Sequence, residues 1–312
     1  MRIEYHRTMV ADRVRNQAFH AALKASIKPG ETIVADIGAG TGLLGMMAAK
    51  LGAREVYLYE TAAVAGLAQD LLKRNRMRNC ILFPCHSIEM ESPPRVDLVI
   101  SETLGNYPLE ENIVATLKDA RRRHMKPGAI MIPRRIRQFV APITTPRIHD
   151  DLIAWDEVGF GIDYRLARTM SMHNIYVRTF TAPDFLAGGR AMVEWDDIDL
   201  TRDPASNRKG EATFPIANAA TLYGFAIWWT AELADGVTMS TAPDAPKTHW
   251  EQLYLPLLEP IVAKAGERVA IALRSKTTDE TGTTLAWTAT HIDAKGKQLA
   301  KQALDLEKGY LP

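Results

Sequence analysis

Two glutamates about a third of the way along the chain have the spacing to bind a cation together. Glu102 ends a predicted strand, and a loop with glycine and proline can bring Glu110 or Glu111 back to the same place. Two carboxylates in one cleft repel each other unless a cation lies between them. A guanidinium group suits that position, because it is planar, stays charged and offers five N–H donors. The pattern predicts a site for a guanidinium group, with a solvated helix start at Glu110 and Glu111 as the alternative.

A glycine-rich turn earlier in the chain has the composition of a nucleoside-binding loop. It follows the predicted strand Thr32–Ile37. Its characteristic residues are Asp36, Gly38, Gly40 and Gly42. Glycines let the backbone approach a ligand closely, and the following helix offers free N–H groups. A dinucleotide fingerprint needs a glycine where this chain has Leu43, so a nucleoside without a pyrophosphate fits better than NAD. The alternative is a purely structural turn.

A further carboxylate and a histidine complete the candidate residues. Glu60 closes the next predicted strand, where its two oxygens can accept both hydroxyls of a ribose. His249 lies in the segment Thr248-His249-Trp250. A lone histidine is more often structural than catalytic, and a catalytic one needs a carboxylate to orient it.

The elements that must position these residues alternate between strand and helix in the first 130 residues. This order is typical of a parallel α/β sheet, whose carboxyl edge binds ligands. It predicts a doubly wound α/β domain that ends near Pro133. The expected strands are Thr32–Ile37, Glu55–Glu60, Asn79–Pro84, Val96–Glu102 and Ala129–Ile132; the expected helices are Leu43–Leu51, Ala65–Asn75 and Asn112–Met125, with a turn at Lys126–Gly128 before the last strand.

Beyond Pro133 the pattern changes to short alternating strands separated by turns, which predicts an antiparallel all-β region. A helix-like segment rich in aromatic residues, Ile148–Leu186, interrupts it. This segment could belong to the core or could form an arm presented to another subunit. The expected strands are Ile136–Val140, Ala191–Glu194, Thr213–Ala217, Tyr223–Trp229, Arg268–Arg274 and Leu285–His291.

The composition is that of a globular chain without a dominant charge. Hydrophobic residues make up 46% and charged ones 24%, and 38 basic residues nearly balance 37 acidic ones. The resulting net charge of +1 argues against a nucleic acid or an anionic membrane as partner. Cys80 and Cys85 lack a second cluster of metal ligands, so we expect reduced cysteines, no metal and a cytoplasmic location. We expect neither a signal peptide nor a membrane segment.

Several segments together resemble one known family. The glycine turn with Glu60 resembles motif I of class I methyltransferases that use S-adenosylmethionine. The loop from Glu102 to Glu111 resembles the double-glutamate loop of the protein arginine methyltransferases, and Thr248-His249-Trp250 resembles their Thr-His-Trp motif. Residues 6–15 resemble their cofactor-covering helix, and residues 155–163 resemble the start of their dimerisation arm. The resemblance to this family covers nearly the whole chain.

The resemblance implies methyl transfer from S-adenosylmethionine to a guanidino nitrogen of arginine in a protein or peptide. The two glutamates of the family's loop stand nine residues apart, which selects Glu111 rather than Glu110 as the partner of Glu102. The same match makes Asp12 the carboxylate that pairs with His249 to remove a proton.

The resemblance also assigns the residues that hold the cofactor. His6 and Arg15 would contact S-adenosylmethionine, Arg15 through the carboxylate of the cofactor, and Met9 would border the pocket. Ile88 and Glu89 match the segment that holds the adenine. The family's tyrosine-rich motif is not recognised ahead of His6, so we expect a cofactor cover that is incomplete or differently built.

For the fold, the resemblance implies a Rossmann-like methyltransferase domain at residues 1–133, in which helices within residues 1–28 cover the cofactor. An antiparallel β-barrel-like domain would follow at residues 134–312. A helical arm at about 148–186, inserted in this second domain, would form a homodimer.

One departure from the family pattern leaves the acceptor open. Thr103 follows the first glutamate of the loop, where a bulky Trp or Phe is usual in the family. The first alternative is a methyltransferase of the same fold that acts on another amine or on a nucleobase. The second is a catalytically weak dimeric module that binds S-adenosylmethionine. The paired glutamates favour a cationic acceptor.

Overall fold

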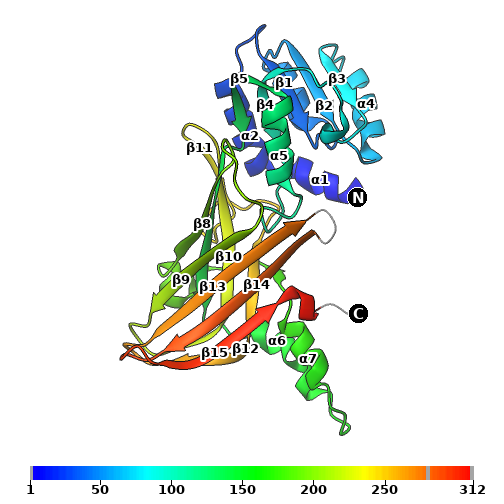
Figure 1. The fold of residues 1–312 in the computed structure, drawn as a ribbon. Coiled ribbons are helices and arrows are strands. Elements are labelled where there is room, and N and C mark those ends of the chain that lie inside the picture. Colours follow the sequence, from blue (N-terminus) through cyan, green and yellow to red (C-terminus); the bar gives the residue numbers. More distant parts are fainter. Residues whose placement is uncertain (1–2, 279–281, 310–312) are drawn as a thin grey trace.

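Two parts with different secondary structure follow one another along the chain. The computed structural model describes residues 3–278 and 282–309. Figure 1 shows an α/β part at the top, an elongated antiparallel β part below it and a helical projection at the lower end. This architecture confirms the predicted fold class.

Five parallel strands form the sheet of the first part, in the order β3-β2-β1-β4-β5. Strand β1 is buried along its whole length, as expected for a parallel strand covered on both faces. Because chain order reverses between β1 and β4, their carboxyl ends form the place where such sheets bind ligands. The elements are α1 (Ile3–Ala11), α2 (Arg13–Ser26), β1 (Ile33–Ile37), α3 (Leu43–Lys50), β2 (Glu55–Tyr59), α4 (Val64–Arg74), β3 (Cys80–Phe83), the 3-10 turn η1 (Ser87–Glu89), β4 (Val96–Ser101), α5 (Ile113–Arg123) and β5 (Met125–Ile132).

One boundary in this part was predicted wrongly. The turn expected at Lys126–Gly128 lies inside β5, which begins at Met125 instead of Ala129. Val96 pairs with Met125, and Leu98 already pairs with Ile130, so the intervening residues of β5 bulge out of the ladder. Proline and glycine there mark a bulge rather than the end of an element.

Two antiparallel sheets form the second part. One has the order β7-β12-β10-β6-β8, with β11 paired to β10, and the other has the order β15-β14-β13-β9. The elements are β6 (Arg135–Ile143), α6 (Arg147–Leu152), η2 (Ala154–Glu157), α7 (Arg165–Met172), β7 (Tyr176–Arg178), η3 (Ala182–Asp184), η4 (Leu186–Gly189), β8 (Val193–Asp199), β9 (Arg208–Pro215), β10 (Ala220–Ala234), β11 (Val237–Ser240), β12 (Gln252–Ala263), β13 (Arg268–Thr278), β14 (Gly282–Ile292), β15 (Gln298–Asp305) and η5 (Leu306–Gly309).

All six strands expected in this part are present, but four others among the described residues were missed. Strand β12 carries Pro256 and Pro260, which interrupt the sequence pattern of a strand, and it is nevertheless buried over most of its length. Strand β15 is a mostly exposed edge, so it lacks an apolar alternation. The short strands β7 and β11 also went unrecognised.

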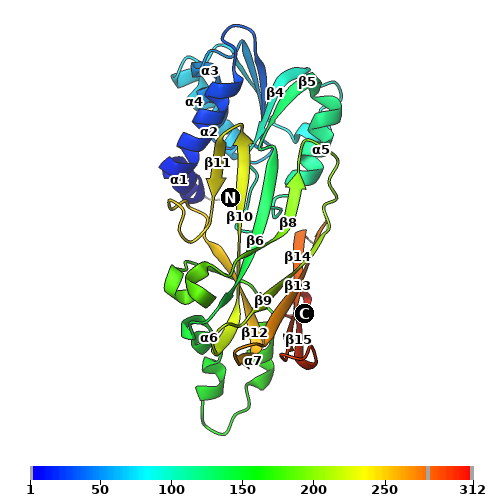
Figure 2. The same ribbon diagram turned by 90° about the vertical axis from the view of Figure 1, so that its left-hand side faces the viewer.

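The segment between β6 and β8 contains the helical projection. Helices α6 and α7 extend from the lower end of the β part in both views (Figures 1 and 2). At its tip, Phe160 has a φ of 57° and a side chain that is 95% exposed. Trp155 stacks on Tyr164 with ring centroids 5.9 Å apart. The arm is therefore an ordered projection with an apolar tip.

The expected domain boundary at Pro133 lies between β5 and β6, where the parallel sheet gives way to the antiparallel one. Helix α2 of the first part packs against β10 and β11 of the second. The same contact joins the β10–β11 end of the second part to the first part. None of the helices in the described residues is long and apolar enough to cross a membrane.

Candidate active site

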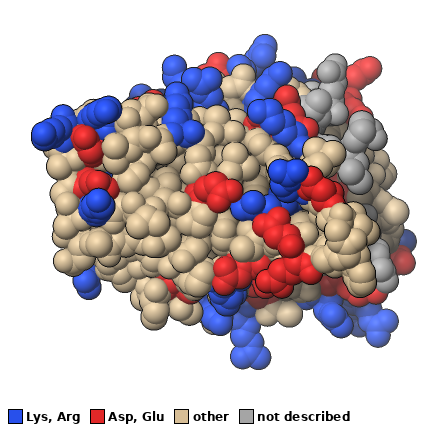
Figure 3. Space-filling model, turned by 90° about the horizontal axis from the view of Figure 1, so that it is seen from below, with Lys and Arg blue, Asp and Glu red and all other residues tan. Residues whose placement is uncertain are grey.

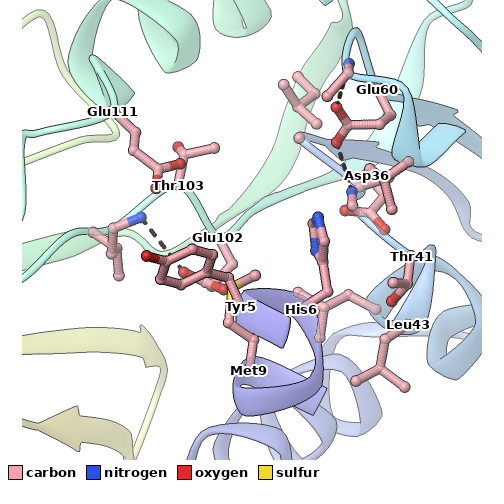
Figure 4. A pocket seen from close by; sticks show the side chains of 18 of the residues that line it. Tyr5, His6, Met9, Asp36, Thr41, Leu43, Glu60, Glu102, Thr103 and Glu111 are labelled. Carbon is pink, nitrogen blue, oxygen red and sulfur yellow. Dashed lines mark hydrogen bonds between the residues drawn. The ribbon is translucent and has the colours of Figure 1, made fainter. Parts of the chain in front are cut away.

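A cavity of about 700 Å³ lies at the carboxyl ends of β1, β2 and β4. Helix α1 lies along one side of it, and Trp250 of the barrel borders another. Figure 4 shows Glu60 and Glu111 on opposite sides, with Glu102 between them. The predicted site residues that line the cavity are His6, Met9, Arg15, Asp36, Gly38, Gly40, Glu60, Glu102, Glu111 and His249. Those that do not line it are Asp12, Gly42, Ile88 and Glu89.

The glycine turn has the backbone that its residue types predict. The φ angles of Gly38, Gly40 and Gly42 are 73°, 55° and 79°, in the region that favours glycine. Gly42 is the N-cap of α3 and has no side chain to intrude on the turn. Gly38 N donates a hydrogen bond to Tyr59 O at 3.0 Å, which ties the turn to β2.

Asp36 supports the turn from beneath. Its Oδ2 accepts a hydrogen bond from Gly45 N in the first turn of α3 at 2.7 Å. Burial raises the pKa of the Asp36 carboxyl to about 7. The charges of Glu60 and Glu102 raise this pKa further, whereas the Gly45 hydrogen bond and the charge of Arg15 lower it. The cavity therefore has a base of acidic groups that favours a positively charged occupant.

Glu60 uses both carboxylate oxygens to hold the surrounding backbone. Its Oε2 accepts a hydrogen bond from Gly40 N and its Oε1 accepts one from Ala62 N, both at 2.7 Å. Each carboxylate oxygen has two lone-pair sites, so Glu60 retains the capacity to accept two hydroxyl groups. This geometry suits the expected contact with a ribose.

Helix α1 directs one face toward the cavity. His6 is buried, and its Nε2 has no hydrogen-bond partner within the described part of the chain. A buried unpaired nitrogen is costly unless a ligand supplies the partner, so His6 fits the expected cofactor contact. Met9 and Tyr5 also reach the cavity (Figure 4). Tyr5, which is 64% exposed, was missed. Tyr5 stands one helical turn before Met9, and residues four apart share one face of a helix. This spacing could have identified Tyr5 as a residue of the same cavity.

Arg15 binds Glu102 directly. Its Nε donates a hydrogen bond to Glu102 Oε2 at 2.8 Å, and its Nη2 donates to the same oxygen. The Nη1 atom donates to Asn16 Oδ1 at 2.9 Å. Both side chains of the ion pair are buried. In this structure Glu102 therefore already binds a guanidinium group, which belongs to the chain itself.

Glu111 and Glu102 lie close enough for their charges to interact. Burial raises the pKa of Glu111 to about 7, and repulsion from Glu102, Glu110 and Glu60 contributes in the same direction. A cation beside Glu111 would favour its charged form. Binding of an acceptor guanidinium between Glu102 and Glu111 stays a prediction.

Glu110 has a different environment from Glu111. It folds over Gly105, where a Cβ would overlap Glu110 Oε2. Burial raises the pKa of Glu110, and hydrogen bonds from the backbone of Tyr107 and Asn106 oppose that effect. The side chain thus packs the two limbs of the loop together. Glu110 and Glu111 are both exposed and stand just ahead of α5, so the alternative of a solvated helix start is not excluded for them.

Asp12 connects α2 to the barrel. Its Oδ1 accepts a hydrogen bond from Arg15 N at 2.9 Å and caps the helix. Its Oδ2 accepts hydrogen bonds from His249 N and lies 2.8 Å from His249 Nδ1. Burial alone would raise the pKa of Asp12, but the hydrogen bonds from Arg15 and His249 outweigh it and the pKa is lowered. The expected Asp12–His249 pair is present, and only His249 reaches the cavity.

The segment expected to hold the adenine approaches the cavity through other residues. Glu89 Oε2 accepts a hydrogen bond from His86 N at 3.2 Å and so caps η1, while Ile88 is exposed. Cys85, His86 and Ser87 line the cavity in their place. Contact of Ile88 and Glu89 with an adenine stays a prediction. Within residues 3–278 and 282–309, no group of three or more His, Cys, Asp or Glu side chains could hold a metal ion.

Comparisons with known proteins divide the chain near Pro133. Residues 19–134 match the family model of ribosomal protein L11 methyltransferase. Residues 135–291, half of the chain, match the arginine methyltransferase oligomerization subdomain.

Individual relatives agree with these matches. Protein arginine N-methyltransferase 6 of Xenopus laevis is 31% identical over 83% of this chain and 79% of its own length. Arginine N(omega)-methyltransferase of Streptomyces achromogenes is 30% identical over 86% of this chain and 75% of its own length. The Trypanosoma brucei PRMT1 enzyme–prozyme complex with AdoHcy has the same fold, with a TM-score of 0.85, 24% identity and coverage of 97% of this chain and 98% of that one. On these matches the chain belongs to the protein arginine N-methyltransferase family.

Proposed function

We propose that the protein transfers a methyl group from S-adenosylmethionine to a guanidino nitrogen of arginine. The observation that carries this proposal is the placement of Glu102 and Glu111 in the same cavity as the glycine turn and Glu60. One part of the cavity suits a nucleoside, and the other suits a guanidinium. Family membership supports the same reaction.

The residues present fit this cofactor. Glu60 would accept the ribose hydroxyls, and His6 would use its unpaired Nε2. Three of the five N–H donors of Arg15 are used by Glu102 and Asn16, so two remain for the carboxylate of the cofactor. When bound, S-adenosylmethionine supplies a methyl group on a positively charged sulfur. The acidic residues around the cavity, including buried Asp36, suit that charge.

Glu102 and Glu111 would act as a clamp on the acceptor. By holding two nitrogens of the guanidinium, they would direct the third toward the methyl group. Alignment of this kind can lower a reaction barrier by several kcal/mol, up to about 7–11 kcal/mol. Each charge-assisted hydrogen bond is worth about 1.5–3 kcal/mol. The two carboxylates would also draw positive charge toward the nitrogens they hold, which leaves the lone pair of the third nitrogen freer to attack.

The methylated guanidinium must lose a proton, and His249 lies on the wall of the cavity for that step. Asp12 accepts a hydrogen bond from the backbone N of His249 and lies against its Nδ1. If Nδ1 carries the proton, Nε2 is left as the acceptor. Asp12 and His249 are therefore the proposed proton route.

The acceptor arginine belongs to a protein or peptide in the main proposal. A second candidate is free arginine, because a relative with 30% identity is named arginine N(omega)-methyltransferase.

Labelled S-adenosylmethionine would be offered with arginine-containing peptides, a cell lysate and free arginine, and the products resolved by mass spectrometry. Glu102→Gln keeps the shape of the side chain but removes its charge, so we expect a rate loss of about a hundredfold or more. Near wild-type turnover by this variant would refute the clamp, and label on another group would identify a different acceptor.

We also propose a head-to-tail homodimer formed through the arm. The tip of the arm exposes Phe160, Ile162 and Leu166, of which Leu166 is 77% exposed. Figure 3, which views the molecule from below, shows a mostly uncharged area on the left, with acidic and basic side chains across the middle and right of this face. Exposed apolar clusters of this kind mark interaction sites. The match to an oligomerization subdomain supports the assignment of the arm.

The first domain offers a surface that the arm of a second copy could occupy. A hollow of about 260 Å³ lies beside α1, and most of its lining is apolar. Its apolar lining residues are Ile3, Val10, Leu43, Met46 and Leu71. Helix α1 borders both this hollow and the cofactor cavity. An arm bound in the hollow would therefore also hold α1 in place over the cofactor.

A cytoplasmic location is also proposed. Cys80 and Cys85 are both free thiols, which suits a reducing compartment. Fractionation of cells that produce the protein would test this location, and recovery with a membrane or secreted fraction would contradict it.

A further inference from the structure

The barrel holds the double-glutamate loop through Trp229, a strand residue that belongs to none of the sequence motifs. We propose that Trp229, together with Trp250, is a positioning residue that sets the orientation of Glu102 by fixing the backbone of the loop. This inference rests on the proposed function, because it concerns how Glu102 is held for the acceptor guanidinium.

Two indole N–H groups bind adjacent carbonyls of the loop. Trp229 Nε1 donates a hydrogen bond to Gly105 O at 3.1 Å, and Trp250 Nε1 donates one to Leu104 O at 2.9 Å. The two indoles meet edge to face, with ring centroids 5.2 Å apart. Trp229 is fully buried and Trp250 nearly so. The pair therefore forms a rigid support beneath residues 104 and 105.

The supported backbone contacts Glu102. Leu104 N donates a hydrogen bond to Glu102 Oε1 at 3.4 Å, drawn as a dashed line in Figure 4, and Arg15 occupies Oε2. A shift of the Leu104–Gly105 segment would move one of the two groups that hold the carboxylate.

The main chain of Trp229 is itself fixed on both sides. In β10 it pairs with Gln138 of β6. On its other side, Thr241 N donates a hydrogen bond to Trp229 O at 2.9 Å, and Trp229 N donates one to Thr241 Oγ1 at 3.2 Å. Because a buried aromatic side chain has few rotamers, a fixed main chain also fixes the direction of its N–H.

Other barrel residues hold the remainder of the loop at greater distance along the chain from Glu102. Tyr107 Oη donates a hydrogen bond to Ser275 Oγ at 2.6 Å, and Thr283 Oγ1 donates one to Leu109 O at 3.1 Å. Among the described residues, Trp229 and Trp250 are thus the barrel side chains that donate hydrogen bonds to the backbone of residues 104 and 105. Trp229 is the more informative of the two, since the Trp250 ring contacts the His249 ring and its loss would disturb a second candidate catalytic group.

The test compares Trp229→Phe with a matched control, Trp287→Phe. Both variants keep an aromatic ring and lose one indole N–H that is bound to a backbone carbonyl. Trp287 Nε1 donates a hydrogen bond to Pro256 O at 2.8 Å inside the barrel, and Trp287 is as buried as Trp229. Neither Trp229 nor Trp287 lines the cavity. Thermal unfolding of both variants measures the structural cost of the lost hydrogen bond.

We expect kcat for the arginine acceptor to fall roughly ten- to a hundredfold in Trp229→Phe, since displacement by about 1 Å has effects of that size. Affinity for S-adenosylhomocysteine should stay within twofold, because the glycine turn and Glu60 are untouched. Trp287→Phe should lose comparable thermal stability and retain wild-type kcat. Equal kcat in wild type and Trp229→Phe would overturn the inference, and so would equal losses of kcat in the two variants.

A second measurement separates action through Glu102 from a general loosening of the site. The Glu102→Gln and Trp229→Phe changes are combined, and their effects on kcat are compared with the single variants. If Trp229 acts through Glu102, the double variant will be no slower than Glu102→Gln alone. Multiplicative losses would overturn the inference while leaving the proposed function intact. Absence of arginine methylation in the wild type would instead refute the proposed function and the role of Trp229 with it.

Discussion

Arg15 Nε lies 2.8 Å from Glu102 Oε2, so a guanidinium of the chain occupies one of the two carboxylates expected to hold the acceptor. The side chains come from α2 and from the end of β4, and they are 8% and 4% exposed. Arg15 is also the residue expected to bind the carboxylate of the cofactor. The same guanidinium thus lies at the junction between the cofactor site and the acceptor site.

Replacement of Arg15 should affect both stability and cofactor binding. In Arg15→Ala, the buried charge of Glu102 would lose its partner, and breaking a buried ion pair costs about 3–5 kcal/mol. We expect a lower melting temperature and weaker binding of S-adenosylhomocysteine in calorimetry. Arg15→Lys retains the charge but not the planar fork, so it should recover part of the stability. An unchanged melting temperature in Arg15→Ala would show that the Arg15–Glu102 ion pair contributes nothing to the stability of the fold.

The pKa of Glu111 predicts how activity depends on pH. Burial raises this pKa to about 7, and only the charged form can hold a guanidinium. As pH falls below about 7, protonation removes the charge, so kcat/KM for the acceptor should decrease about tenfold per pH unit. Above about 7 it should level off. Profiles of kcat/KM recorded from pH 5.5 to 9 would show this decrease in the wild type. If the same decrease persisted in Glu111→Gln, it would have to be assigned to another group.

Glu60 should contribute to cofactor affinity through its charge and its two backbone contacts. Loss of charge-assisted hydrogen bonds worth about 1.5–3 kcal/mol corresponds to weaker binding by roughly ten- to a hundredfold. We therefore expect Glu60→Ala to reduce the affinity for S-adenosylhomocysteine in calorimetry, with a smaller effect for Glu60→Gln. Unchanged affinity in Glu60→Ala would refute the ribose assignment.

The apolar tip of the arm should determine the oligomeric state. A charge at Phe160 would be buried in the proposed dimer, so Phe160→Glu should shift the protein to a monomer in light scattering coupled to size exclusion. Val262 is a matched control, because it is 68% exposed and lies on β12 of the barrel rather than in the arm. Val262→Glu should leave the oligomeric state unchanged. A wild-type monomer, or a Phe160→Glu dimer, would contradict the proposed interface.

Much of the first domain could be predicted from local sequence. Strands β1, β2 and β4 and the positions of the glycines follow from apolar runs and from residue types that permit positive φ. Their parallel order then brings Glu60 and Glu102 to one edge of the sheet. Prediction was wrong where the local signal was ambiguous. Pro127 and Gly128 suggested a turn, but in the structure they form a bulge in β5, which pairs with β4 on both sides of them.

The barrel was less predictable because its strands are defined by distant pairing. Strand β12 contains two prolines, yet it pairs with both β10 and β7. Its register with β10 shifts between Leu222 and Gly224, where the two strands have unequal numbers of residues. No local periodicity reports such a shift.

By itself, the sequence determined which chemical groups are available and which of them are local neighbours: the glycine turn, Glu60, and two glutamates nine residues apart in one loop. Only the tertiary structure decided which side chains that are distant in the sequence come into contact. Arg15 reaches Glu102 across 87 residues, and Trp229 reaches Gly105 across 124. Such contacts depend on how α2 and the barrel pack against the sheet. Packing is a property of the whole fold, so the spacing of residues along the chain does not encode these contacts.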